Sequence, residues 1–356
     1  MTLEARVAEL AGDVEPADEA AAAAARARHD RLAKPPGSLG ALEAVGARLA
    51  AVAGTCPPPV PARPVAVVAA ADHGVHARGV TPWPQSVTAA MVRAMCAGDA
   101  SVNAIAAAVG AQVAVLDVGV AGPPVEHPRA RRARVRPGTR DLAAGPAMTR
   151  EEAARALLAG AGLAEELLGS GCDLLVPGDM GIANTTAGAC LVVALTGRAA
   201  GELTGRGAGA DDATLERKRA VVASALDLHR PDAADPLGTL AALGGLEHAA
   251  LAGAVLAAAA ERRPVVLDGL AACAAALAAV AIAPAAAGYL LAGHRSPEPA
   301  AGAALDRLGL EPLLDLGMRL GEGTGGLCAV PLVVAAARVL SEVATIAELE
   351  PGAAGP

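Results

Sequence analysis

The chain has 356 residues, of which 54% are hydrophobic and 19% are charged. This composition excludes an intrinsically disordered protein, because such a chain can bury a sizeable core. At about 150 residues per domain, the length corresponds to roughly two domains. A formal net charge of −8, with one Trp, one Tyr and no Phe, argues against a nucleic-acid partner, which needs a basic face and aromatic stacking platforms.

The N-terminal residues and the cysteines bear on the compartment of the protein. The first residues contain no basic stretch followed by an apolar core, so we expect no signal peptide. The cysteines are scattered, without a C-x-x-C pair or a His at metal-ligand spacing: Cys56, Cys96, Cys172, Cys190, Cys273 and Cys328. We therefore expect reduced, buried thiols in a cytoplasmic protein, and no bound metal.

The order of the expected elements predicts a parallel α/β sheet. The first sixty residues are helical and loop-like, with a tight Lys34–Gly40 segment between two helices. Apolar runs that end in polar or Gly-rich turns then alternate with helical stretches, which is typical of βαβ units. The expected strands are Pro64–Ala70, Val113–Val118, Leu174–Val176, Pro264–Leu267 and Tyr289–Ala292. Ligands of such sheets bind beyond the carboxyl ends of the strands, where these turns lie.

The uncharged segment from Gly269 to Gly293 is long enough to cross a membrane. Most of it is Ala, which contributes little to insertion, and Pro284 and Gly288 interrupt it. We expect instead a helix over Leu270–Ile282, a break at Pro284 and a buried strand, and no membrane span.

A Gly-rich turn at Gly178–Thr186 joins an expected strand to an expected helix. The backbone N–H groups of Asn184, Thr185 and Thr186 would lie at the helix start, where unpaired donors and the helix dipole favour a phosphate or carboxylate. An ordinary capped helix start would give the same pattern. Asn184 is one of only two asparagines in the chain, which favours a binding role.

A second Gly-rich segment, Gly205–Gly209, is followed by Lys218, one of only two lysines. Gly205, Gly207 and Ala210 satisfy a G-x-G-x-x-A dinucleotide pattern, but no strand precedes them, so the match is weak. The simpler interpretation is a phosphate site, in which backbone amides surround the phosphate and Lys218 supplies the counter-charge.

Glu322 is a lone carboxylate among glycines, and enclosure in a dry pocket would raise its proton affinity, as a general base requires. A helix-start Glu that interacts with the helix dipole is the alternative. His73 and His294 follow expected strands and could move protons, although isolated histidines are more often structural. The arginine-rich segment Arg129–Arg140 contains no aromatics, and we interpret it as a solvated loop or sheet edge.

Several motifs together resemble the nicotinate-nucleotide:dimethylbenzimidazole phosphoribosyltransferase family. The resemblance runs in order over nearly the whole chain, and its last motif is the most specific. The motifs are Lys34–Gly40, Ala71–Val75, Pro84–Thr88, Gly145–Thr149, Gly178–Thr186, Asp268–Gly269, His294–Pro299 and Leu314–Gly325.

The resemblance implies transfer of phosphoribose from nicotinate mononucleotide to 5,6-dimethylbenzimidazole. The products would be nicotinate and α-ribazole 5′-phosphate, which is used for the lower ligand of cobalamin. It implies no cofactor, and a homodimer. The implied fold is a three-layer parallel Rossmann-like sheet with helices on both faces over residues 31–304, and a small helical domain from residues 1–30 and 305–356.

The resemblance also assigns roles to residues of this chain. Glu322 would be the base that takes the proton from the benzimidazole nitrogen, and Asp179 could stabilise positive charge on the sugar. The implied base-binding residues are Thr81, Trp83, Gln85 and Met180. The implied nucleotide-binding residues are Gly181, Asn184, Thr185, Thr186, Gly207, Lys218, Ser296, Arg319 and Gly321.

Three positions depart from the family pattern. Asp179 stands where the family usually has Glu, Ala183 where it has Gly, and Ala208 where it has Thr. A shorter carboxylate and a methyl group in the phosphate loop could weaken nucleotide binding or change which base is accepted. The alternatives are therefore a paralogue with altered base specificity and a non-catalytic nucleotide-binding protein.

Overall fold

The structure, a computed structural model, describes residues 1–349. Within these residues the strands form one parallel sheet of seven strands in the order β3-β2-β1-β4-β5-β6-β7. The strands are β1 (Pro64–Ala71), β2 (Gln112–Gly119), β3 (Ala130–Arg132), β4 (Leu174–Met180), β5 (Val265–Leu267), β6 (Leu290–His294) and β7 (Pro312–Leu314). The predicted parallel α/β sheet is confirmed.

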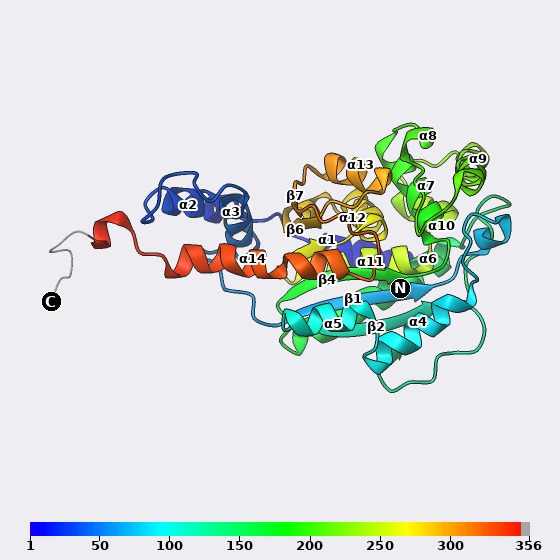
Figure 1. Cartoon of the computed structure of the whole chain (residues 1–356), viewed down its shortest axis with the longest axis horizontal. Helices are drawn as coiled ribbons and strands as arrows, with labels where there is room; N and C mark the ends of the chain where they lie inside the picture. Colours follow the sequence, from blue (N-terminus) through cyan, green and yellow to red (C-terminus); the bar gives the residue numbers. More distant parts are fainter. Residues whose placement is uncertain (350–356) are drawn as a thin grey trace.

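Helices cover both faces of this sheet (Figure 1). The helices are α1 (Leu3–Gly12), α2 (Glu19–His29), α3 (Ala41–Ala53), α4 (Ser86–Ala97), α5 (Ser101–Ala108), α6 (Arg150–Gly169), α7 (Asn184–Thr196), α8 (Ala200–Leu203), α9 (Asp212–His229), α10 (Pro236–Leu243), α11 (Leu246–Ala260), α12 (Leu270–Ile282), α13 (Pro299–Leu308) and α14 (Thr324–Glu342). Short 3-10 helices are η1 (Gly74–Arg78), η2 (Pro284–Tyr289) and η3 (Ile346–Leu349).

The continuous apolar run of β1 follows from burial on both faces. Val65 and Val67 belong to the core cluster that contains residues of α6, α7, α11 and α12. Ala66 and Val68 belong to the cluster on the opposite face, with residues of α4, α5 and α14. A central parallel strand therefore needs apolar side chains at every position, which is why it does not alternate with polar residues.

The uncharged segment from Gly269 to Gly293, which we expected not to span a membrane, lies inside the protein. It forms α12, η2 and β6, whose bounds follow the expected helix, break and strand, and most of its residues are buried. Within the described residues, α14 is the one helix long and apolar enough to cross a membrane by length and composition. More than half of its apolar window is buried in the protein, and the core helix of a soluble protein passes the same test.

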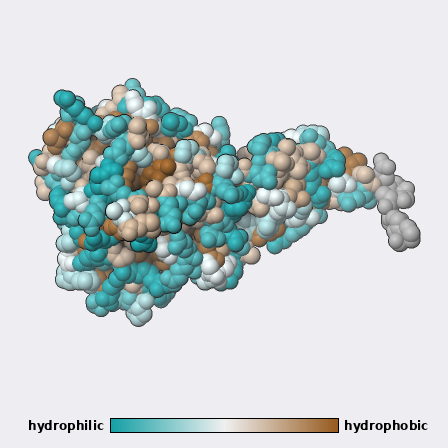
Figure 2. Space-filling view, turned by 180° about the vertical axis from the view of Figure 1, so that it is seen from behind, coloured by the Kyte–Doolittle hydropathy of each residue, from teal (hydrophilic) through white to brown (hydrophobic). Residues whose placement is uncertain are grey.

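A helical extension, formed by α2, α3 and the C-terminal part of α14, projects from the main body (Figures 1 and 2). Here α2 packs on α3 and α3 on α14, while α14 also contacts β5 and β6. An isolated bridge between Leu32 and Thr345 joins the two ends of the chain. This position of α14 ties the extension to the sheet.

The boundaries of the small helical domain remain a prediction. Three elements lie in a different part of the molecule from the one that these boundaries assign to them. Helix α1 packs on α6 of the main body, and β7 is an edge strand of the sheet, although both were assigned to the small domain. Helix α3 lies in the extension, although it was assigned to the large domain. Residues 350–356 of the predicted small domain lie outside the described residues.

Candidate functional site

A cavity of about 100 Å³ lies at the carboxyl ends of the strands, as the topology predicts. Residues that follow β1, β4, β5 and β6 line it, together with the loop between α8 and α9 and the segment before α14. Predicted site residues among its lining are Thr81, Trp83, Asp179, Gly181, Asn184, Thr185, Gly207, Lys218, Ser296, Arg319 and Gly321.

The turn between β4 and α7 forms one wall of the cavity. Ala183, the residue before α7, has a left-handed backbone with φ of 78°. This conformation suits Gly better than Ala, which explains physically why a Gly is usual there. The turn is fixed from below, because the Ile182 N–H donates to Thr88 Oγ1 at 3.1 Å and the Thr88 hydroxyl donates to Asp72 at 2.7 Å.

Lys218 of α9 lies behind the same wall and is buried. Its Nζ donates to Thr185 Oγ1 at 2.7 Å and to the Gly205 carbonyl at 3.0 Å. Burial lowers the pKa of Lys218, and the nearby Glu298 carboxylate opposes that shift. Lys218 therefore joins the two predicted phosphate-binding segments as well as placing a positive charge at the cavity.

Glu298, which was not predicted, orders the Gly-rich loop. Its Oε1 accepts the N–H of Gly207 at 2.7 Å, while its Oε2 has no hydrogen-bond partner. Gly207 has φ of 57°, and a β-carbon there would lie 2.7 Å from Thr185 Oγ1, so this position requires Gly.

Asp179 lies near the end of β4 and is buried. Burial raises its pKa to about 7; the negative charges of Asp268 and Glu247 add to this effect, while His248 and the Asn184 hydrogen bond oppose it. The Asn184 side-chain amide donates to Asp179 Oδ2. A carboxylate at the cavity wall thus changes its charge near neutral pH.

Glu322 follows Gly321, which lines the cavity, but its own side chain is not part of the lining. Its backbone is left-handed, with φ of 63°, and packs against Gly178 of β4. The carboxyl group is buried beside the backbone N–H of Val102 at the start of α5. Burial raises its pKa, and Oε2 has no hydrogen-bond partner.

Asp268 fixes the turn that carries Glu322. Its carboxylate accepts the backbone N–H groups of Gly323, Gly325 and Gly326 at 3.0, 2.7 and 3.1 Å. Burial alone would raise its pKa, but the His294 imidazole and the N–H donors hold the pKa below its usual range. Asp268 is therefore an ionised anchor beneath the start of α14.

Of the predicted base-binding residues, Thr81 and Trp83 line the cavity, whereas Gln85 and Met180 do not. The Gln85 side-chain amide donates to the His73 carbonyl at 3.2 Å, so it holds the loop. Met180 packs on the core cluster beneath α4 and α14. Among the predicted nucleotide-binding residues, Thr186 is buried in α7 and does not line the cavity.

His73, Glu247 and His248 form a fully buried cluster in which one donor atom of each lies within 4.8 Å of the others. His73 Nε2 and His248 Nδ1 each lie 2.8 Å from Glu247 Oε1. His248 Nδ1 accepts the Gly245 N–H at 3.2 Å, so in this tautomer it has no proton to donate to Glu247. Despite burial, the imidazoles lower the pKa of Glu247, and Glu247 raises the pKa of His73. The three side chains therefore form one buried cluster whose charges are coupled.

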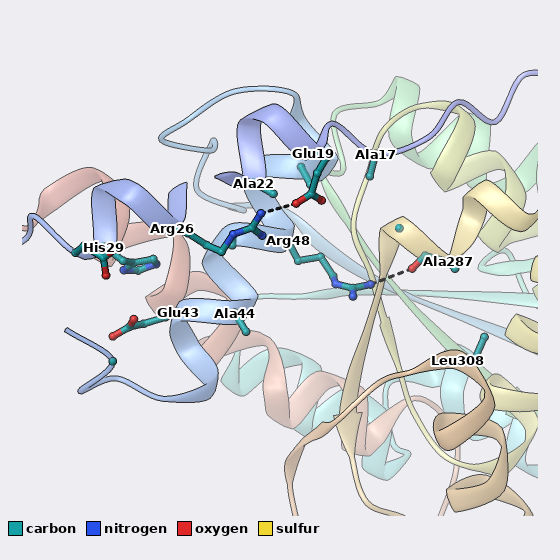
Figure 3. A pocket seen from close by; sticks show the side chains of 15 residues that line it. Ala17, Glu19, Ala22, Arg26, His29, Glu43, Ala44, Arg48, Ala287 and Leu308 are labelled. Atoms are coloured by element: carbon teal, nitrogen blue, oxygen red, sulfur yellow. Dashed lines mark hydrogen bonds and ion pairs between the residues drawn. The ribbon is translucent and has the colours of Figure 1, made fainter. Parts of the chain in front are cut away.

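A larger hollow, of about 780 Å³, lies where α2 and α3 approach η2 and α13. In Figure 3 Arg26 points toward Glu19, and Arg48 donates to the Ala287 carbonyl at 3.0 Å. None of the predicted site residues lines it. The hollow is therefore separate from the candidate site.

Known proteins with similar sequences indicate the same family as the motifs. A phosphoribosyltransferase family model matches residues 14–350. The chain is 54% identical over 344 residues to the nicotinate-nucleotide–dimethylbenzimidazole phosphoribosyltransferase of Salinispora tropica, covering 93% of this chain and 94% of that protein. It is 51% identical to the protein of the same name from Chloroflexus aggregans, covering 94% of each. The chain belongs to this phosphoribosyltransferase family.

A solved structure supports the assignment. The crystal structure of CobT from Thermus thermophilus matches with a TM-score of 0.89 and 48% identity, covering 92% of this chain and 98% of that chain. The resemblance inferred from the motifs is therefore confirmed. Glu298 lies within the His294–Pro299 motif, so the sequence did offer a signal that could have marked it as a site residue. Glu247 and His248 lie outside every motif, so the sequence offered no such signal for them.

Proposed function

We propose that this phosphoribosyltransferase transfers phosphoribose from nicotinate mononucleotide to 5,6-dimethylbenzimidazole, giving nicotinate and α-ribazole 5′-phosphate for the lower ligand of cobalamin. The observation that carries the proposal is one cavity lined by both predicted subsites, with the ionisable Asp179 in its wall. Family membership over nearly the whole chain supports the same reaction.

The nucleotide would bind at the Asn184 turn and the Gly207 loop. The N–H groups of Asn184, Thr185 and Thr186 are not unpaired as expected, because they donate within the turn to the Gly181 carbonyl, Asn184 Oδ1 and the Ala183 carbonyl. The positive end of the α7 dipole still favours an anion. Lys218 and the exposed Arg206 and Arg319 bring positive charge to the cavity. These charges suit a phosphate monoester on a ribose.

The chemistry needs no electrophile to activate the leaving group, because the pyridinium nitrogen of the donor is already positive. When the C1′–N bond breaks, its electron pair neutralises that nitrogen, and positive charge develops on the sugar. A negative Asp179 would stabilise this charge. Attack by the benzimidazole nitrogen from the opposite face inverts the β configuration to α.

The attacking base must lose the proton of its second ring nitrogen. We propose Glu322 as the acceptor: its Oε2 has no hydrogen-bond partner, and its raised pKa suits a general base. The residue adjoins the cavity through Gly321.

The test is to incubate the purified protein with nicotinate mononucleotide and a panel of benzimidazoles, purines and phenols, and to identify the products by mass. We expect nicotinate and α-ribazole 5′-phosphate, with dimethylbenzimidazole preferred. Preference for another base would favour the alternative of a paralogue with altered base specificity. The shorter side chain of Asp179 would then be the physical reason for the change. Binding of the nucleotide without nicotinate release would favour the non-catalytic alternative.

We also propose that the protein acts as a cytoplasmic homodimer. The projecting helical extension offers a surface for a second copy, with Ile346 and Leu349 exposed near its end. The six cysteines are all free, which agrees with a reducing compartment. Sedimentation equilibrium of the full chain should give twice the monomer mass of 34.6 kDa, and a monomer would contradict the proposal.

A further inference from the structure

Two loops from distant parts of the chain meet over the cavity. One contains Thr81 and Trp83 and lies between η1 and α4; the other contains Gly207 and Ala208 and lies between α8 and α9. The first loop carries the proposed base-binding residues, and the second carries part of the proposed phosphate site. A contact between them connects the two subsites directly.

Two hydrogen bonds make this connection. Trp83 Nε1 donates to the Ala208 carbonyl at 3.0 Å, and Arg217 of α9 donates to the Gly79 carbonyl at 2.7 Å. His76 Nε2 lies 2.9 Å from the Trp83 carbonyl and so steadies the first loop. The only polar atom of the indole is thus used to bridge the loops, while its ring faces the cavity and solvent.

The cavity is narrow in this arrangement. Its volume of about 100 Å³ is below the roughly 300–1,000 Å³ typical of small-molecule sites. Trp83 is 48% exposed, so the core does not hold its ring in place. The ring can therefore move aside as a nucleotide and a base enter, and its hydrogen bond to Ala208 can form again once the two loops have settled around them.

We propose that Trp83 couples the two substrate subsites, because its hydrogen bond to the Ala208 carbonyl closes the base loop onto the phosphate loop. Nucleotide bound at the phosphate loop then favours the closed base loop, and bound base favours the ordered phosphate loop. The coupling is reciprocal by thermodynamic linkage. This inference rests on the proposed function and adds a role that base contact alone does not require.

The coupling can be measured without turnover. Ribose 5-phosphate carries the phosphate and sugar but no nicotinate, so it cannot react with the base. We expect the affinity for dimethylbenzimidazole, measured by calorimetry, to rise about three- to tenfold in saturating ribose 5-phosphate, the range that one net hydrogen bond provides. Trp83 is the only Trp in the chain, so its fluorescence should also change when ribose 5-phosphate binds.

Trp83→Phe is the decisive variant, because it keeps an aromatic face and removes the N–H donor. We expect the affinity ratio with and without ribose 5-phosphate to fall to nearly one. Arg217→Ala removes the second bridge away from the ring and should lower the ratio as well. Leu228→Ala, an exposed change on the same helix as Arg217, is the matched control and should keep the wild-type ratio.

The outcomes separate this inference from the proposed function. Wild-type protein that binds both compounds and releases nicotinate, but with an affinity ratio of one, would overturn the coupling alone. An unchanged ratio in Trp83→Phe, or loss of ribose 5-phosphate binding in that variant, would also overturn it. Absence of any binding by the wild-type protein would instead contradict the proposed function.

Discussion

Two buried carboxylates dominate the candidate site at the scale of single residues. Asp179 and Glu322 both have raised pKa values, and in both cases burial is the largest cause. Each therefore holds a proton more tightly than a surface carboxylate does. The sequence identified both residues, but only the structure shows that Asp179 is at the cavity and that Glu322 adjoins it through the backbone.

Glu322→Gln tests the proposed general base. We expect nicotinate release to fall by about 10²- to 10⁴-fold, the usual contribution of a positioned base, while the affinity for nicotinate mononucleotide changes little. Calorimetry gives the affinity and steady-state assays give kcat. Glu311→Gln, at an exposed position, is the control. Unchanged turnover in Glu322→Gln would remove this residue from its role.

Asp179→Asn tests how much stability the protein loses by burying this carboxylate. The folded protein binds the Asp179 proton with a pKa of about 7, against an ordinary value of 3.8, so stability is lost as pH rises through this window. The Asn variant has no such loss, at about 1.4 kcal/mol per unit of pKa difference. We expect it to gain stability over wild type at pH 8 but not at pH 4, measured by urea unfolding. Equal differences at both pH values would contradict the assignment.

At the scale of elements, the sequence located β1, β2, β4, β6 and the short but fully buried β5, and it missed β3 and β7. The missed strands have three residues each and lie at the sheet edges, so they carry neither length nor full burial as a signal. Helix starts were easier, because capping is local. At the start of α6, the Thr149 and Glu152 side chains form a capping box, with reciprocal bonds of 3.1 and 2.7 Å. The arginine-rich segment includes β3, as a sheet edge allows.

The contact between α6 and α11 provides the test at this scale. A β-carbon at Gly253 of α11 would lie 1.9 Å from the Leu157 carbonyl oxygen of α6. We expect Gly253→Ala to lower the free energy of unfolding by about 1–3 kcal/mol, because the helices must separate. Gly302→Ala in α13 meets no atom within 4 Å and should raise stability by up to about 1 kcal/mol. Similar effects of both changes would contradict close helix packing as the cause.

At the scale of the whole molecule, the site is assembled from segments far apart in the chain. Thr185 lies in the first turn of α7, Lys218 lies on α9 and Glu298 precedes α13. Lys218 bonds Thr185, Glu298 bonds Gly207, and the charges of Lys218 and Glu298 influence each other. Lys218 and Glu298 therefore bring opposite charges near each other in the site. No single segment of the sequence shows this, because the two residues lie on different elements.

Lys218→Met and Glu298→Gln measure this balance. Removal of the ammonium leaves the buried Thr185 hydroxyl and Gly205 carbonyl without their donor, so we expect Lys218→Met to cost about 1–3 kcal/mol of stability. The double variant should lose less than the sum of the two single variants. Urea unfolding of the four proteins gives the interaction energy, and strictly additive losses would show that the two groups do not interact.

The sequence by itself determined the family, the parallel sheet, the buried α12–β6 segment and half of the residues that line the cavity, 11 of 22. These features depend on local patterns: apolar runs, turn glycines and motif spacing. Only the tertiary structure decided that Gln85 holds its loop from outside the cavity and that Met180 packs on the core. It also decided that Asp268 anchors the Glu322 turn and that Trp83 bridges two loops. These depend on which side chains meet across long stretches of the chain, and such meetings are fixed by packing of the whole chain and leave no local pattern.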